Sequence, residues 1–183
     1  MVSVKYLAHA GAAPATPGTP SRPSALEPPR FEHRQPLLIA GLRRHIGSDT
    51  QDEIPLLWRE LAQRRGAIEG IVGRAAYGVV IHGAQAGGVD YLAALEVVPH
   101  AALPAGLERM SIPAHQYAIF AHRGHVSALK HTMMLIWNQW LPTSGRVRAH
   151  PGPGSPDMIE FYGEDFDPET GLGAIEVWLP INS

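Results

Sequence analysis

Cysteine is absent from the 183 residues of the chain. Disulfide bonds, thiolate nucleophiles and zinc sites built on cysteine are therefore excluded. An excess of charge of one sign is also missing, because 15 lysines and arginines stand against 17 aspartates and glutamates, a formal net charge of -2. Without a basic surplus the chain has little attraction for a phosphate backbone, so we expect no direct binding to nucleic acid.

Long hydrophobic runs are missing too. No stretch of about 18 or more apolar residues occurs, so no membrane-spanning helix is predicted. The first ten residues contain only a short apolar stretch, whereas a secretory signal needs a longer one. Together with the lack of cysteine, these features lead us to expect a cytoplasmic protein.

Motifs for nucleotides, serine hydrolysis and metals are not found either. No glycine pattern follows a strand and opens a helix, and there is no GxSxG sequence, so we predict no cofactor. Ten histidines invite a metal interpretation, and the densest group is His122, His125 and His131. The first two straddle a strand end and Gly124, and no acidic residue joins them at ligand spacing, so we predict no metal site.

The chain divides by composition into a leader and a domain. Residues 11–30 are almost entirely Ala, Pro, Gly, Ser and Thr, a mixture that cannot bury enough apolar surface to offset its ordering entropy. We predict a disordered leader over residues 1–30 and one domain over residues 31–183. A docking role for the proline-rich stretch is the alternative, although no aromatic or basic anchor accompanies it.

An internal repeat with a period of 79 to 80 residues organises the domain. The first copy, residues 31–100, predicts a strand, a helix and two strands, at 36–46, 54–65, 77–82 and 90–98. The second copy, residues 109–183, predicts the same order, at 116–123, 127–141, 158–162 and 174–181. Trp58 aligns with Trp137, and Glu96 aligns with Glu176.

The repeat predicts an α+β fold in which duplicated β-α-β-β units form a pseudo-symmetric antiparallel sheet with two helices. One helix covers only one face of its three strands, so each unit needs a partner to complete the burial of its sheet. Packing the two units together creates a cleft between the repeats, and ligands commonly bind in such clefts.

A series of short motifs runs through the second half in a fixed order: IPAHQYAIF at 112–120, Gly124, WLPTSG at 140–145, IEFY at 159–162 and EVWLPI at 176–181. They resemble the GyrI-like family, which includes the effector-binding domains of AraC-type transcription regulators. The resemblance is specific over residues 109–181 and looser over residues 31–100. It implies a pocket for apolar, often cationic, small molecules. Only about thirty residues precede the domain, too few for a helix-turn-helix, so we expect a stand-alone member.

The resemblance identifies Glu176, on the last strand, as the central acid of the pocket. Strand alternation places Glu176 and Trp178 on one face, and a carboxylate beside a tryptophan needs a partner or a ligand if it is buried. The alternative is an edge-strand glutamate that faces water. Glu96, the counterpart in the first copy, is expected to serve structure or the pocket rim.

Aromatic residues are expected to complete this pocket. Tyr162 matches the family's tyrosine and shares a strand face with Glu160, and rings around an anion favour a cation. Family members often follow the tyrosine with Asp, where this chain has Gly163. The other predicted ligand-binding residues are Trp178, Trp140, Trp137 and Phe120, although tryptophans at helical spacing more often belong to a core.

Three functions are compatible with these features, and whether the protein is an enzyme stays open. The first is a small-molecule binding domain for apolar or cationic ligands, acting in sensing or sequestration. The second is a hydrolase of strained-ring (cyclopropanoid) toxins, with Glu176 as general acid/base and Tyr162 as a hydrogen-bonding helper. The third is a gyrase-inhibitor-like module that binds a protein partner through its outer face.

Overall fold

The computed structural model describes residues 26–47, 49–81, 87–149 and 155–182. Its strands are β1 (Arg30–Arg34), β2 (Leu37–Gly47), β3 (Ile71–Ile81), β4 (Gly88–Val97), β5 (Glu108–Ile112), β6 (His115–His122), β7 (Pro156–Tyr162) and β8 (Ile175–Pro180). Its α-helices are α1 (Glu53–Arg64), α2 (Leu129–Leu135) and α3 (Leu141–Thr143). Short helical segments are η2 (Arg65–Ala67), η3 (Val126–Ala128) and the π-helical η4 (Ile136–Trp140), which joins α2 to α3.

The predicted duplication is confirmed. The first copy is β2-α1-β3-β4 and the second is β6-α2-β7-β8, and all strands join one antiparallel sheet in the order β1-β6-β8-β7-β3-β4-β2-β5. Strand β3 begins at Ile71, earlier than predicted, because its pairing with β4 shifts register between Ile71 and Ala76. The regular alternation that identifies a strand starts only after that irregularity.

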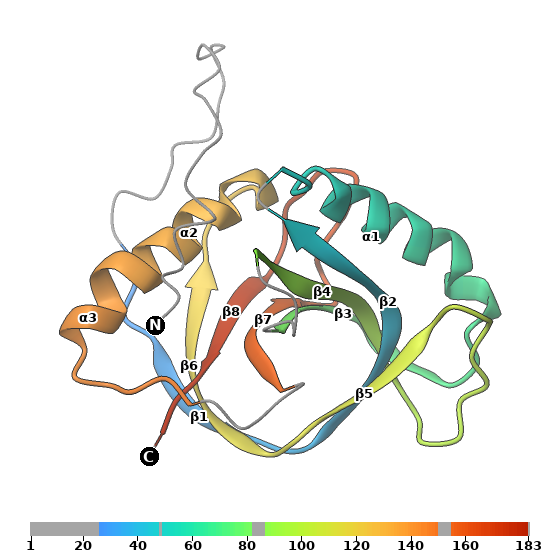
Figure 1. Ribbon diagram of the computed structural model, residues 1–183, viewed down its shortest axis with the longest axis horizontal. Helices are drawn as coiled ribbons and strands as arrows, with labels where there is room; N and C mark the ends of the chain where they lie inside the picture. Colours follow the sequence, from blue (N-terminus) through green and yellow to red (C-terminus); the bar gives the residue numbers. More distant parts are fainter. Residues whose placement is uncertain (1–25, 48, 82–86, 150–154, 183) are drawn as a thin grey trace, which may run out of the picture.

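Strands β1 and β5, which the sequence does not predict, join the two ends of the sheet. Strand β1 runs into β2, and β5 into β6, after only two residues each. The register that pairs Arg34 with His115 continues unshifted to Leu37 and Ile112, which places Pro36 opposite Pro113. Since proline has no N–H to donate, the facing pair interrupts one long two-stranded ribbon. The ribbon connects the ends of the strand order, and the sheet curls strongly (Figure 1).

The two faces of the curled sheet are buried in different ways. On the inner face a single core cluster draws residues from both copies, including Ile39, Tyr117 and Trp178. On the outer face there are two clusters, one beneath each helix: Leu57 and Leu61 belong to the cluster of α1, and Met133 to that of α2. Both helices therefore lie on the same side of the sheet, as Figure 1 shows, and the space between them lies over the middle strands.

The described structure includes residues before the predicted boundary at residue 31. Leu26 packs against the cluster beneath α2, Glu27 lies 3.3 Å from Arg123, and Arg30 begins strand β1. The rest of the predicted leader, residues 1–25, lies outside the described residues. Among the described helices, none has the length and apolar character needed to cross a membrane.

The close approach of β2 and β4 at Gly41 leads to a prediction about the stability of the fold. A Cβ added at Gly41 would meet the backbone of the neighbouring strand, with the Cα of Ala94 at 2.6 Å, whereas a Cβ at Gly66 meets nothing within 4 Å. We expect Gly41→Ala to lower the free energy of unfolding by about 2 kcal/mol or more, because the backbone of β4 has to move. Gly66→Ala is the control and should change it by less than about 1 kcal/mol. Urea unfolding measures both, and equal effects would contradict the packing described for β2 and β4.

Candidate functional site

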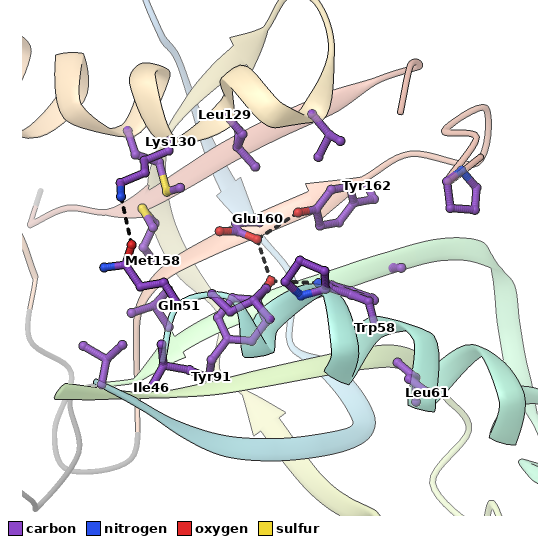
Figure 2. Close-up of a pocket in the computed structure, with 18 of the residues that line it drawn as sticks. Ile46, Gln51, Trp58, Leu61, Tyr91, Leu129, Lys130, Met158, Glu160 and Tyr162 are labelled. Carbon is purple, nitrogen blue, oxygen red and sulfur yellow. Dashed lines mark hydrogen bonds between the residues drawn. The ribbon is translucent and has the colours of Figure 1, made fainter. Parts of the chain in front are cut away.

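A pocket of about 1350 Å³ opens between the two helices, on the outer face of the sheet. Its walls come from α1 and α2, and its floor comes from β3, β4 and β7. Trp58 and Trp137, which the repeat aligns, line it from opposite copies. The predicted cleft between the repeats is therefore present (Figure 2).

A buried carboxyl group lies at the floor of this pocket. Glu160 on β7 is 6% exposed, and its Oε2 accepts hydrogen bonds from the hydroxyls of Tyr91, at 2.6 Å, and Tyr162, at 2.9 Å. Trp58 Nε1 in turn donates to the Tyr91 hydroxyl at 3.1 Å. Both hydroxyls reach the same carboxyl oxygen, and no other hydrogen bond to Glu160 is found within the described part of the chain. Oε1 is therefore available to a ligand, and Figure 2 shows it pointing away from the two tyrosines.

Strand register explains why these groups meet. Glu160 pairs with Val177 on β8 and with Gly78 on β3, so its side chain points to the outer, helix-bearing face. A Cβ at Gly78 would overlap the Tyr91 hydroxyl and lie 2.6 Å from Glu160 Oε2. The glycine thus leaves the space in which tyrosine and glutamate form their hydrogen bond.

Burial controls the ionisation of this cluster. Loss of water raises the pKa of Glu160, and the two donated hydrogen bonds oppose that rise. Burial, reinforced by the nearby Glu160 charge, raises the pKa of Tyr91 and of Tyr162 well above the ordinary tyrosine value. Both hydroxyls therefore stay protonated and act as donors, while the carboxyl is poised to gain from any positive charge placed beside it.

Aromatic rings surround the carboxyl. The rings of Trp58 and Tyr162 meet edge to face at 5.2 Å, and the rings of Tyr162 and Phe166 lie 4.9 Å apart. All three residues line the pocket, as does Trp137 on the side of α2. Such walls provide apolar contact for a ligand and, through their ring faces, attraction for a cation.

Two further polar contacts lie on the pocket wall. Lys130 Nζ donates to Gln51 Oε1 at 2.8 Å, which links α2 to the segment before α1. Arg148 Nη1 lies 3.2 Å from Asp157 Oδ1, and the Arg148 guanidinium stacks over the Trp137 ring at 5.1 Å. All five residues line the pocket, so it holds charges of both signs.

Three of the predicted ligand-binding residues, Glu160, Tyr162 and Trp137, line the pocket. Glu176, predicted as the central acid, is absent from the lining of this pocket. Because Glu160 faces outward with Val177, Glu176 and Trp178 point to the inner face. There Glu176 accepts hydrogen bonds from Trp178 Nε1, at 2.7 Å, and Arg30, at 2.9 Å. The hydrolase pair of Glu176 and Tyr162 is therefore divided between two faces of the sheet.

The other two predicted ligand-binding residues, Phe120 and Trp140, pack in the core cluster beneath α2 and are absent from the pocket lining. Phe120 is fully buried, and Trp140 meets its ring edge to face at 4.9 Å. Gly163 does line the pocket, and a Cβ there would lie 3.0 Å from both Ala174 Cβ and Asp165 Oδ1. A larger residue at Gly163 would thus need its neighbours to move.

Sequence reasoning missed Tyr91, Trp58, Gln51 and Lys130 as pocket residues. Alternation within the predicted strand 90–98 puts Tyr91 on the face of Ala93 and Leu95, which was a usable signal for the tyrosine. The alignment of Trp58 with Trp137 was a second signal. Nothing in the sequence indicates that Gln51 and Lys130 meet across the two copies.

The histidine group forms structural contacts. His122 Nδ1 lies 2.8 Å from Thr132 Oγ1, and its Nε2 lies 3.1 Å from the carbonyl oxygen of His125. Within the described ranges, no cluster of three or more His, Cys, Asp or Glu is arranged to hold a metal ion. Burial lowers the pKa of His122, which favours the neutral ring in this position.

Comparisons with known proteins agree with the fold and identify the family. The family model of the GyrI-like small molecule binding domain matches the sequence over residues 27–182. The transcriptional regulator BrlR of Pseudomonas aeruginosa is 26% identical over 154 residues, which make up 83% of this chain and 54% of the regulator. The chain thus spans about half the length of that relative.

Two solved structures share the fold at low sequence identity. A protein of Staphylococcus aureus MU50 has a TM-score of 0.64 at 17% identity, over 87% of this chain and 100% of that one. SAV2435, bound to tetraphenylphosphonium, has a TM-score of 0.63 at 17% identity, over 84% and 93% of the two chains. At such identity the likeness concerns the fold alone.

The raised pKa of Glu160 predicts a pH-dependent stability. A carboxyl whose pKa is higher in the folded than in the unfolded state stabilises the fold while it is protonated, and this stability is lost as the pH rises through the folded-state pKa. Glu160→Gln stays neutral, so the variant should gain stability relative to the wild type between about pH 5 and pH 8. Urea unfolding at both pH values measures the difference, in which all other titrating groups cancel. A difference that is constant or shrinks with rising pH would contradict the burial of this carboxyl.

Proposed function

Because this chain belongs to the GyrI-like small molecule binding domain family, we propose that its pocket captures organic cations with apolar groups, with Glu160 as the counter-ion. The observation that carries this proposal is the burial of one carboxyl group at the pocket floor, where two tyrosines donate to Oε2 and Oε1 points away from them. The family membership supports a small-molecule ligand, and the site supports its charge.

The energetics of the site favour a cation that is poorly hydrated. An isolated carboxylate loses much of its hydration when buried, and a positive charge placed beside it recovers part of that loss. A cation whose charge is spread over apolar groups enters the pocket at little cost in its own desolvation, and it gains contact with Trp58, Tyr162 and Trp137. Compact, strongly hydrated cations gain much less.

The biological role that fits this binding is sensing or sequestration. BrlR, the relative found by sequence, is a transcriptional regulator, and SAV2435 holds tetraphenylphosphonium. A domain of this family binds a small molecule, and such binding reports the presence of the compound or lowers its free concentration. We propose the same role for this chain.

Tetraphenylphosphonium is the probe that tests the proposal. We expect the purified protein to bind it and Glu160→Gln to weaken binding by about tenfold or more, because the variant keeps the shape of the side chain and removes its charge. Isothermal titration calorimetry measures the affinity. Glu176→Gln is the matched control, since it removes a carboxylate on the inner face, and it should leave the affinity unchanged. Binding that depends on Glu176 and not on Glu160 would refute the assignment.

Hydrolysis of strained rings is a second candidate function, favoured by one observation: a buried carboxyl of raised pKa beside a protonated tyrosine. Such a carboxyl is suited to general acid/base catalysis near neutral pH. In this candidate Glu160 replaces Glu176 in the catalytic role, with Tyr162 as its hydrogen-bonding helper. A cyclopropane electrophile should then be consumed by the wild type and not by Glu160→Gln, as followed by mass spectrometry. A compound that is bound but unchanged would exclude turnover of that compound.

A further inference from the structure

The charges around the pocket are not those of a site for a cation alone. The lining holds two acidic side chains, Asp157 and Glu160, and five basic ones: Arg59, Arg65, Arg74, Lys130 and Arg148. Asp157 already lies 3.2 Å from Arg148. Arg59 and Arg74 are exposed, where water and salt screen their charges, but Arg65, Lys130 and Arg148 are half-buried. These half-buried basic groups repel a bare cation, so the balance of charge favours a ligand that also carries negative charge.

Lys130 is the basic group best placed to meet such a charge. It is half-buried on α2, and its Nζ donates to the neutral amide oxygen of Gln51 at 2.8 Å. No ion pair joins Lys130 to a carboxylate within the residues that the structure describes. An ammonium group has three donors, and a partly desolvated one is stabilised more by an anion than by an amide.

Lys130 and Glu160 line the same pocket but do not form an ion pair with each other. Figure 2 shows Lys130 and Gln51 on one side of Glu160, and Tyr162 on the other. Apolar side chains of the lining, among them Leu129, Met133 and Met158, belong to the same cavity. Methionine adapts its shape readily, so this part of the pocket suits a broad apolar body.

We infer that the pocket selects zwitterionic ligands, in which an apolar body carries a cationic group for Glu160 and a carboxylate that Lys130 binds in place of Gln51. The inference rests on the proposed function, because it takes Glu160 as the counter-ion of the cationic group. It adds that Lys130 determines specificity: the residue discriminates between a ligand with a free carboxylate and the same ligand without it.

Rhodamine B and its ethyl ester form the matched pair of probes. Both carry the same delocalised cation, and they differ in that only rhodamine B has a free carboxylate at neutral pH. The wild-type protein should bind rhodamine B about tenfold more tightly than the ester, as measured by fluorescence anisotropy. Lys130→Met should abolish this preference while leaving the affinity for the ester unchanged or higher. Lys130→Arg should retain the preference, since it keeps the positive charge.

Two controls separate this inference from the proposed function. Arg123→Met removes a positive charge outside the pocket lining and should leave the preference for rhodamine B intact. Glu160→Gln should weaken the binding of both dyes, because both carry the cation.

Equal binding of the two dyes by the wild type, or a preference that survives in Lys130→Met, overturns the zwitterion inference. If the wild type still binds the ester, and Glu160→Gln weakens that binding, the proposed function stands although the zwitterion inference has failed. If neither dye binds, or if Glu160→Gln binds the ester as well as the wild type does, the proposed function fails and the inference fails with it.

Discussion

The burial of one carboxyl group is the constraint on which the site depends. Glu160 is held on the outer face of a curled sheet by two tyrosine hydroxyls, and the raised pKa of the carboxyl records the cost of keeping its charge there. Two helices leave the space above it open as a pocket of about 1350 Å³. A buried carboxylate that is only partly compensated attracts a cation strongly, and contact with the aromatic walls adds to the binding free energy of that cation.

The duplicated fold makes this arrangement possible. Each copy places its helix on the outer face of the sheet, and the pocket forms where the two copies meet. The inner face is covered by a core cluster that both copies share. The ribbon interrupted at Pro36 and Pro113 joins the two ends of the sheet around this core. The pocket lies on the outer face, where the copies contribute different residues: Tyr91 from the first, Glu160 and Lys130 from the second.

The order of elements and the family could be predicted from the sequence because periodicity, a repeat and short motifs are local features. The strands β1 and β5 could not, since they are short, rich in charge and defined by pairing partners far along the chain. Of the predicted ligand-binding residues, only some line the pocket. Alternation correctly separates the two faces of each strand, but only the register between β7 and β8 puts Glu160 and Glu176 on opposite faces. The packing of α1 and α2 then decides which of these faces carries the pocket.

The position of the ligand is therefore central to the proposed function, in which the cation would bind between α1 and α2, beside Glu160. Tetraphenylarsonium is a close analogue of tetraphenylphosphonium whose arsenic atom scatters anomalously, so a crystal of the complex locates the cation without model bias. The account predicts a single strong anomalous peak in the outer pocket, within contact distance of the Glu160 carboxylate and the Trp58 and Tyr162 rings. A peak on the inner face, beside Glu176 and Trp178, would contradict it.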